Sequence, residues 1–117
     1  MTLESFFQNL KDNPDIIEFN DTMNIIDSLY IFTPTSFKNG DLVNEPGQNS
    51  GSCKIFSFAH LHSLTPQQTL TCFGGYYRDD VLKHPENEDH QNIRNFMKSG
   101  WDGIEFDSEP LKAKAVS

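Results

Sequence analysis

Chemically useful side chains concentrate in residues 42–58, where a loop of Pro, Gly, Asn and Ser leads into an apolar stretch. The pattern predicts that this loop delivers Ser52 and Cys53 to the first turn of a helix. Free amide hydrogens and the positive end of the helix dipole can hold an anion there or lower the pKa of a thiol. The segment therefore indicates a reactive cysteine, an anion-binding turn or an ordinary helix cap.

A cysteine nucleophile needs a base and a group that orients that base. Later residues of suitable type are His84 or His90 as the base, and Asp89 or Asn92 as the orienting group. The order Cys, His, Asn is that of papain-like enzymes, but Lys54 and Ile55 replace the second cysteine and the aromatic residue expected there. Cys53 and His90 are therefore catalytic candidates. The alternative is that Cys53 is a half-buried structural residue behind a serine cap.

The same loop could bind an anion without covalent chemistry. The amides of residues 51–53 and the hydroxyls of Ser50 and Ser52 are suitable donors for a phosphate or carboxylate. No Gly-x-x-x-x-Gly-Lys-Ser pattern is present, so the sequence does not indicate nucleoside triphosphate binding. Simple helix capping is the alternative, since serine is a preferred cap. Together with polar and aromatic residues of later segments, the ligand-binding candidates are Gln48, Ser50, Gly51, Ser52, Tyr76 and Arg94.

The histidines do not form a recognisable metal motif. His60 and His62 are two positions apart, which places them on different faces of a helix, and His84 and His90 flank an acidic turn. Neither a His-Glu-x-x-His pattern nor a Cys-x-x-Cys pair occurs. We predict neither a metal site nor a cofactor.

The charge balance narrows the class of partner. The 117 residues include 9 Lys and Arg against 17 Asp and Glu, a formal net charge of −8, without a basic cluster. Nucleic acids and anionic membrane surfaces require such a cluster, so both are disfavoured. No apolar run approaches the length of a membrane span. A protein partner is the remaining expectation, and the chain itself is predicted to be a monomer or a weak homodimer.

Apolar periodicity and capping residues predict five helices. They lie between Thr2 and Asn13, from a cap at Asn20 or Asp21 to Tyr30, over 53–62, over 66–82 after Thr65, and from a cap at Asp89 to Gly100. Two glycines, Gly74 and Gly75, fall inside the fourth helix, where each costs about 1 kcal/mol relative to alanine. They predict a bend or a close backbone contact that brings residues 72–77 opposite residues 47–53.

Short strands complete the expected fold. Residues 16–19 and 103–106 have strand-like composition, and residues 37–43 predict a hairpin that turns at Asn39-Gly40. The fold class is therefore α+β and helix-rich, with about five helices and a small antiparallel hairpin or sheet. Residues 1–111 are expected to form a single globular domain, and residues 112–117 a frayed tail.

Several sequence blocks resemble the HopJ type III effector family. They are Asp21-Thr22-Met23, Phe32-Thr33-Pro34-Thr35, LVNEPGQNSGSCKIF at residues 42–56, Cys72-Phe73-Gly74, Tyr76-Tyr77-Arg78, and HQNIRNFMKSGW at residues 90–101. The resemblance implies a virulence-associated bacterial protein that type III secretion delivers into a host cell, with no reaction, cofactor or catalytic residue attached to it.

The expected location follows from the resemblance and from two sequence features. Two cysteines, Cys53 and Cys72, are too few for a disulfide framework, so a reducing cytosol is the default. The N-terminus lacks the basic and apolar regions of a Sec-type signal peptide. We therefore expect the protein in the bacterial cytoplasm, with delivery into the host cell as the route that the resemblance adds.

Overall fold

The computed structural model describes residues 1–114 and has a helix-rich α+β architecture, as predicted. The helices are α1 (Leu3–Asp12), α2 (Phe19–Leu29), α3 (Ser50–Leu61), α4 (Pro66–Thr71), the π-helix η2 (Tyr76–Val81) and α5 (Gln91–Ser99), with 3-10 turns η1 (Pro14–Ile16) and η3 (Gly100–Gly103). The strands are β1 (Tyr30–Phe32), β2 (Phe37–Asn39), β3 (Leu42–Asn44), β4 (Ile104–Phe106) and β5 (Leu111–Ala113).

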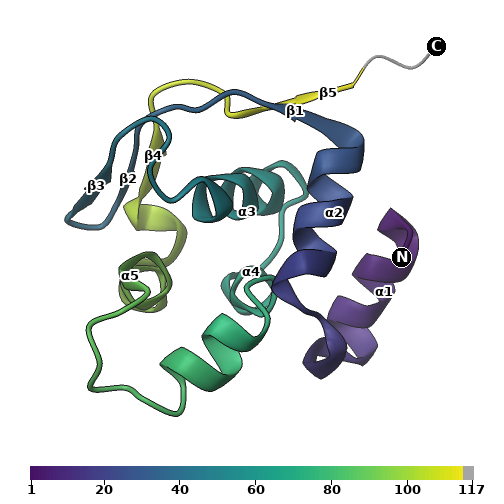
Figure 1. Ribbon diagram of the computed structural model, residues 1–117, viewed down its shortest axis with the longest axis horizontal. Helices are drawn as coiled ribbons and strands as arrows, with labels where there is room; N and C mark the ends of the chain where they lie inside the picture. Colours follow the sequence, from purple (N-terminus) through teal and green to yellow (C-terminus); the bar gives the residue numbers. More distant parts are fainter. Residues whose placement is uncertain (115–117) are drawn as a thin grey trace.

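The helix α3 forms the centre of the molecule (Figure 1). Five of its consecutive residues, Ile55 to Ala59, are buried, because apolar side chains occur on every side of this helix. Phe56 alone contacts the rings of Phe37, Phe73 and Phe96, at centroid distances of 6.2, 5.6 and 5.0 Å. The elements around α3 therefore share one aromatic core.

The strands form two short antiparallel sheets that follow one another along a bent ribbon. In one sheet β1 pairs with β5, and in the other β2 lies between β3 and β4. Two backbone hydrogen bonds span the bend between the sheets: Thr33 N–H to Pro110 O at 2.8 Å, and Asp107 N–H to Ser36 O at 3.1 Å. Figure 1 shows the β1–β5 part of the ribbon lying over α3.

The predicted helix starts at Thr2 and Thr65 are confirmed. Thr2 and Ser5 form a capping box at the start of α1. Thr65 and Gln68 form another at the start of α4, with Pro66 as the first helical residue. Each box satisfies amide hydrogens that the first helical turn leaves free, which is why such starts are readable from local sequence.

The predicted strand at residues 16–19 is wrong. Pro14 opens the 3-10 turn η1, and Phe19 is already the first residue of α2. The predicted cap at Asn20 or Asp21 is also displaced, because Glu18 is the N-cap. Asp21 instead accepts a hydrogen bond from the Glu18 N–H at 3.0 Å, so its carboxylate serves the helix start from inside the first turn.

The predicted fourth helix breaks at Gly74. α4 ends at Thr71 and η2 begins at Tyr76, because Gly74 adopts a positive φ of +61°. The Gly74 backbone packs against the start of α2, where an added Cβ would lie 2.5 Å from the Phe19 N atom. The Thr22 hydroxyl reinforces this contact by donating to the Cys72 carbonyl at 2.8 Å.

Three further boundaries differ from the predictions. The hairpin turns at Gly40-Asp41, because Asn39 is a buried strand residue that pairs with Leu42. α3 begins at Ser50, three residues earlier than predicted. The predicted frayed tail is wrong at Lys112 and Ala113, which belong to β5 and pair with β1, while residues 115–117 of that tail lie outside the described residues. Within residues 1–114, no helix has both the length and the apolar character needed to cross a membrane.

Candidate functional site

A pocket of about 520 Å³ opens where α3 and α5 begin. Gly51 and Ser52 contribute the α3 side, and His90 and Asn92 contribute the α5 side. Phe19, Phe73 and Tyr76 provide aromatic walls from the start of α2 and the segment after α4. Residues from four distant parts of the chain thus meet at one concave site, which we call the α3–α5 pocket.

Both helix starts present unsatisfied amides at this pocket. The N-cap residues Asn49 and His90 have left-handed backbones, with φ of 50° and 52°, and neither side chain caps its own helix. The first intrahelical bonds are donated by Cys53 and Arg94. The amides of residues 50–52 and 91–93 therefore have no acceptor within their helices, and they supply positive potential where the two dipoles converge.

Three asparagines hold the two helix starts together. The Asn44 Oδ1 atom accepts from Asn49 Nδ2 at 2.7 Å and from Asn92 Nδ2 at 3.0 Å, and Asn44 Nδ2 donates to Asn92 Oδ1 at 3.1 Å. Asn44 belongs to β3, so the hairpin bridges α3 and α5. Asn39 extends the network by donating to the Asn92 carbonyl at 2.7 Å. Among the described residues, the Asn39 Oδ1 is the one buried side-chain nitrogen or oxygen without a hydrogen-bond partner.

The aromatic wall is built around Tyr76, which is 44% exposed. Its ring lies 5.1 Å from the Phe19 ring and 5.2 Å from the His90 ring. Phe19 in turn touches the start of α3, since a Cβ added to Gly51 would lie 2.7 Å from the Phe19 ring. The wall therefore joins α2, η2 and the start of α5 and offers a flat surface for an apolar or aromatic group.

The position of His90 depends on Asp80 and on a half-buried arginine, Arg94, that fixes the preceding loop. The His90 Nε2 atom lies 3.1 Å from Asp80 Oδ2. The Arg94 guanidinium donates to the carbonyls of Asp89 at 2.6 Å and His84 at 3.0 Å, and to the Asp89 carboxylate at 2.7 Å. This hydrogen bond lowers the pKa of Asp89. Arg94 is thus committed to fixing the loop that precedes His90, and it does not line the pocket.

Cys53 sits behind the pocket and does not line it. Its side chain is 2% exposed, and burial raises the pKa of the thiol to about 11, with a backbone hydrogen bond from Thr35 acting in the opposite direction. The thiol is therefore protonated at neutral pH, whereas an activated nucleophile has a lowered pKa. Cys53 has no part in the function proposed below.

The structure gathers some of the ligand-binding candidates and separates others. Gly51, Ser52 and Tyr76 line the α3–α5 pocket. Gln48 and Ser50 stabilise the preceding turn instead, with Gln48 Oε1 accepting from the Glu45 N–H at 3.1 Å and Ser50 Oγ donating to the Gly47 carbonyl at 3.4 Å. Within residues 1–114, no three His, Cys, Asp or Glu side chains gather where a metal could bind.

Sequence reasoning missed part of the site. The sequence does not indicate that Phe19 lines the pocket, because its surroundings predict a strand. The sequence pattern around Phe73 predicts only an ordinary core residue. Asn44 was also missed, since asparagine before a proline-containing loop usually indicates a turn. The local signal for the site was that a polar segment precedes each of the helices α3 and α5. The sequence alone could not show that these two segments lie close together in the fold.

The fold and the pocket define a small α+β domain with a concave site between two helix starts. The chain belongs to the HopJ type III effector protein family, whose model matches residues 3–111. It is 53% identical to the protein of a crystal structure described as "unknown function protein VPA0580". That comparison covers 97% of this chain and 95% of the other, with a TM-score of 0.95. A search of curated protein sequences gives no match.

Proposed function

We propose that this HopJ-family domain is a binding module for a small ligand that carries an anionic group. The carboxylate or phosphate of the ligand occupies the α3–α5 pocket and accepts hydrogen bonds from the first-turn amides of both helices. An apolar or aromatic part of the ligand rests on Tyr76. The domain acts by binding in this proposal, and it requires no covalent step.

One observation carries the proposal: two helices of 12 and 9 residues begin at the same cavity without side-chain caps. A capped helix start satisfies its own amides, whereas these starts leave donors for an external acceptor. The asparagine network fixes the two starts relative to each other before any ligand arrives. Such preorganisation lowers the entropic cost of binding.

The net charge of −8 does not oppose this assignment. Exposed carboxylates more than about 10 Å away are largely screened at 0.1 M ionic strength. Donors in direct contact with a ligand act at hydrogen-bond distance and are much less screened. The acidic surface does predict slow association at low salt, because it repels an approaching anion.

Substitution of Ser52 by aspartate tests the proposal. An aspartate in the first turn of α3 is favoured by the helix dipole, by about 0.3–1 kcal/mol, so the fold should be kept or stabilised. The same carboxylate places a competing anion in the pocket. Ser52→Asn is the matched neutral control, because it has nearly the same shape without the charge.

The measurement is calorimetric titration with inorganic phosphate and with benzoate as a probe that has an aromatic body. We expect the native protein and Ser52→Asn to bind benzoate, and Ser52→Asp to bind it at least tenfold more weakly while melting no earlier. Equal benzoate binding by Ser52→Asp and Ser52→Asn would place the ligand elsewhere. The absence of binding by the native protein to either probe would contradict an anion site.

The family description supports a second part of the proposal, that the chain is delivered by type III secretion and acts inside a host cell. A fusion to an enzyme reporter that is active only in host cytosol tests this delivery. We expect a reporter signal in the host cytosol only when the delivering strain has a functional secretion ATPase. Equal signal with and without that ATPase would reject type III delivery.

A further inference from the structure

A second concave surface lies away from the α3–α5 pocket, between the C-terminal half of α3 and the ribbon formed by β4 and β5. It encloses about 490 Å³. The residues that form its floor and walls are His60, Leu61, Trp101, Ile104, Phe106 and Leu111. We call this surface the β4 groove. Its Leu61 is 52% exposed, so apolar area is available to a partner.

The backbone at the edge of this groove is free to pair. β4 is the edge strand of its sheet, with β2 on one side only. Gly40 N–H donates to Gly103 O, and Asp107 N–H donates to Ser36 O, so residues 103, 105 and 107 face β2. Because antiparallel ladders alternate, the Phe106 N–H and the Ile104 and Phe106 carbonyls point to the open edge. An extended chain can accept and donate there.

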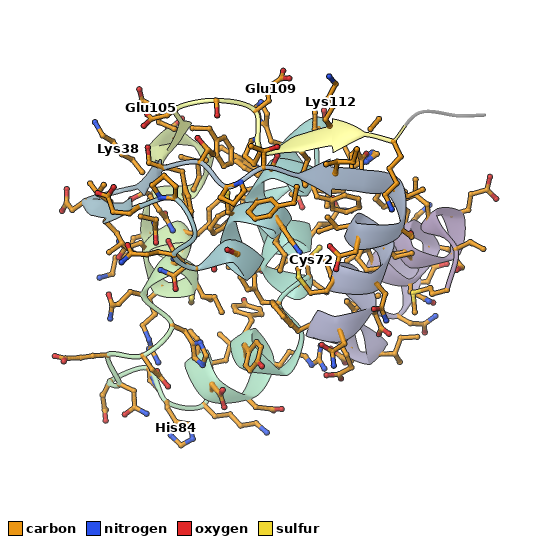
Figure 2. All side chains as sticks on the ribbon, turned by 45° about the horizontal axis from the view of Figure 1, so that its top comes forward. Lys38, Cys72, His84, Glu105, Glu109 and Lys112 are labelled. Atoms are coloured by element: carbon orange, nitrogen blue, oxygen red, sulfur yellow. The ribbon has the colours of Figure 1, made fainter. Side chains whose placement is uncertain are left out.

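The side chains of β4 specify which chain would fit. Ile104 and Phe106 face the groove, whereas Glu105 is exposed and lies opposite Lys38 of β2. Asp107 and Glu109 continue the exposed acidic series, and Figure 2 shows Glu105 and Glu109 projecting away from the body of the molecule. A strand added at the open edge would place its own exposed residues beside Glu105, where Lys or Arg pairs favourably.

We propose that the β4 groove docks an extended peptide segment in which apolar and basic residues alternate. The apolar residues enter the groove against Trp101 and Leu61, and the basic residues lie beside Glu105 and Glu109. The peptide backbone extends the β3–β2–β4 sheet by one strand. This surface is independent of the anion pocket, and its occupant has the opposite charge.

Trp101 makes the proposal directly measurable. It is the single tryptophan of the chain, it lines the groove, and its Nε1–H donates to the Leu64 carbonyl at 3.1 Å. Its ring is further fixed by Phe96 at 5.1 Å. A peptide that covers the groove excludes water from the surroundings of the Trp101 ring. The tryptophan fluorescence of the protein reports that change without an added label.

The experiment is a fluorescence titration of the full chain with two synthetic peptides, one alternating Lys and Val, the other alternating Glu and Val. We expect the Lys–Val peptide to shift the Trp101 emission to shorter wavelength and to bind at least tenfold more tightly than the Glu–Val peptide. We expect Glu105→Gln to weaken Lys–Val binding severalfold. Glu86→Gln, which removes the same charge from an exposed turn, should have little effect.

Amide exchange separates strand addition from simple charge attraction. Exchange of the Phe106 amide should slow when the Lys–Val peptide binds, since this N–H then gains an acceptor. Peptide binding without a change in Trp101 emission or in Phe106 exchange would overturn the proposal. Equal losses in Glu105→Gln and Glu86→Gln would also overturn it. So would a dimer of the free protein that Glu105→Lys dissociates, because a second copy would then occupy the edge.

Discussion

Gly74 lies directly against the backbone of Phe19, so that any Cβ at position 74 would stand 2.5 Å from the Phe19 N atom. Through this contact, the start of α2 packs against the turn between α4 and η2. Phe19 then reaches Gly51 with its ring, and the same residue therefore touches both glycine positions. The placement of α2 and the shape of the α3–α5 pocket depend on this one approach.

The Gly74 contact predicts that Gly74→Ala is strongly destabilising. The variant combines a left-handed backbone with a backbone collision, and we expect the free energy of unfolding to fall by about 2–5 kcal/mol. Gly47→Ala is the control, because Gly47 also has a positive φ, of +86°, but no atom within 4 Å of the added Cβ. Urea denaturation measures both. Equal losses would show that backbone strain alone decides the cost.

The asparagine bridge predicts coupled losses of stability and binding. Asn44→Ala removes the acceptor of the Asn49 side-chain amide and leaves the buried Asn92 Nδ2 without a partner, which should lower the free energy of unfolding by about 1–3 kcal/mol. Because the two helix starts are then no longer held together, benzoate affinity should fall as well. Asn95→Ala, which removes a hydrogen bond to the Asn39 carbonyl outside the pocket, is the comparison. If Asn44→Ala and Asn95→Ala lost similar benzoate affinity, Asn44 would have no specific role in positioning the two helix starts.

Arg94 should be irreplaceable by lysine. A lysine keeps the charge but cannot reproduce the hydrogen bonds to His84, Pro85 and Asp89. We expect Arg94→Lys to loosen the loop before His90 and to return the Asp89 pKa towards its ordinary value. Carbon-detected NMR titration of the Asp89 carboxyl group checks this. An unchanged pKa in Arg94→Lys would show that the charge suffices without the geometry.

The buried thiols predict an alkaline limit of stability. Burial raises the pKa of Cys53 to about 11 from an ordinary 9.0, so the folded state favours the protonated thiol. That contribution is complete below pH 9 and is lost as the pH rises towards 11. Denaturation midpoints should therefore fall over this range, less so in Cys53→Ala. At pH 7, iodoacetamide should label Cys53 only as fast as the protein unfolds, and rapid labelling of folded protein would contradict this environment.

His62 predicts a second, acidic limit. Its ring packs on Phe58 at 4.7 Å and Phe7 at 5.1 Å, and burial lowers the pKa of His62 below its usual 6.5. The folded state therefore favours the neutral ring. Stability from this source is present above pH 6.5 and is lost as the pH falls through the lowered value.

Because Phe7 belongs to α1, the acid loss should appear first as weaker docking of that helix. Amide exchange in α1 should accelerate at pH 5 relative to pH 7 after correction for intrinsic rates. In His62→Gln, which has no titrating ring, the difference between the two pH values should shrink. An unchanged difference would assign the acid sensitivity to other groups.

Local signals explain which elements could be predicted from sequence. The start of α4 can be predicted from Thr65, Pro66 and Gln68 alone. The hydrogen bonds of its cap connect residues only three positions apart, so the local sequence determines them. β5 has no such signal. Leu111-Lys112-Ala113 becomes a strand only through its pairing with β1, which lies far away in the sequence at residues 30–32.

The candidate site likewise has one part that could be predicted from the sequence and one part that could not. A relation between residues 47–53 and 72–77 was predicted, and Ser52 and Tyr76 do line one pocket. The predicted reason was different, since the atoms nearest to Gly74 belong to Glu18 and Phe19 at the start of α2. The hidden part is Asn44, whose partners at positions 49 and 92 are fixed by tertiary packing. Asparagine is frequent in turns, so its type alone does not reveal a buried bridge.

The bent ribbon has a consequence for the order of folding. β1 and β2 lie within residues 30–39, and their partners β5 and β4 lie within residues 104–113. Both sheets are therefore completed only after residues 104–113 are available. Pairing across so long a loop carries a large closure entropy and is typical of slow folding. A nascent chain on the ribosome must keep β1 without its partner until residues 111–113 have been synthesised and released.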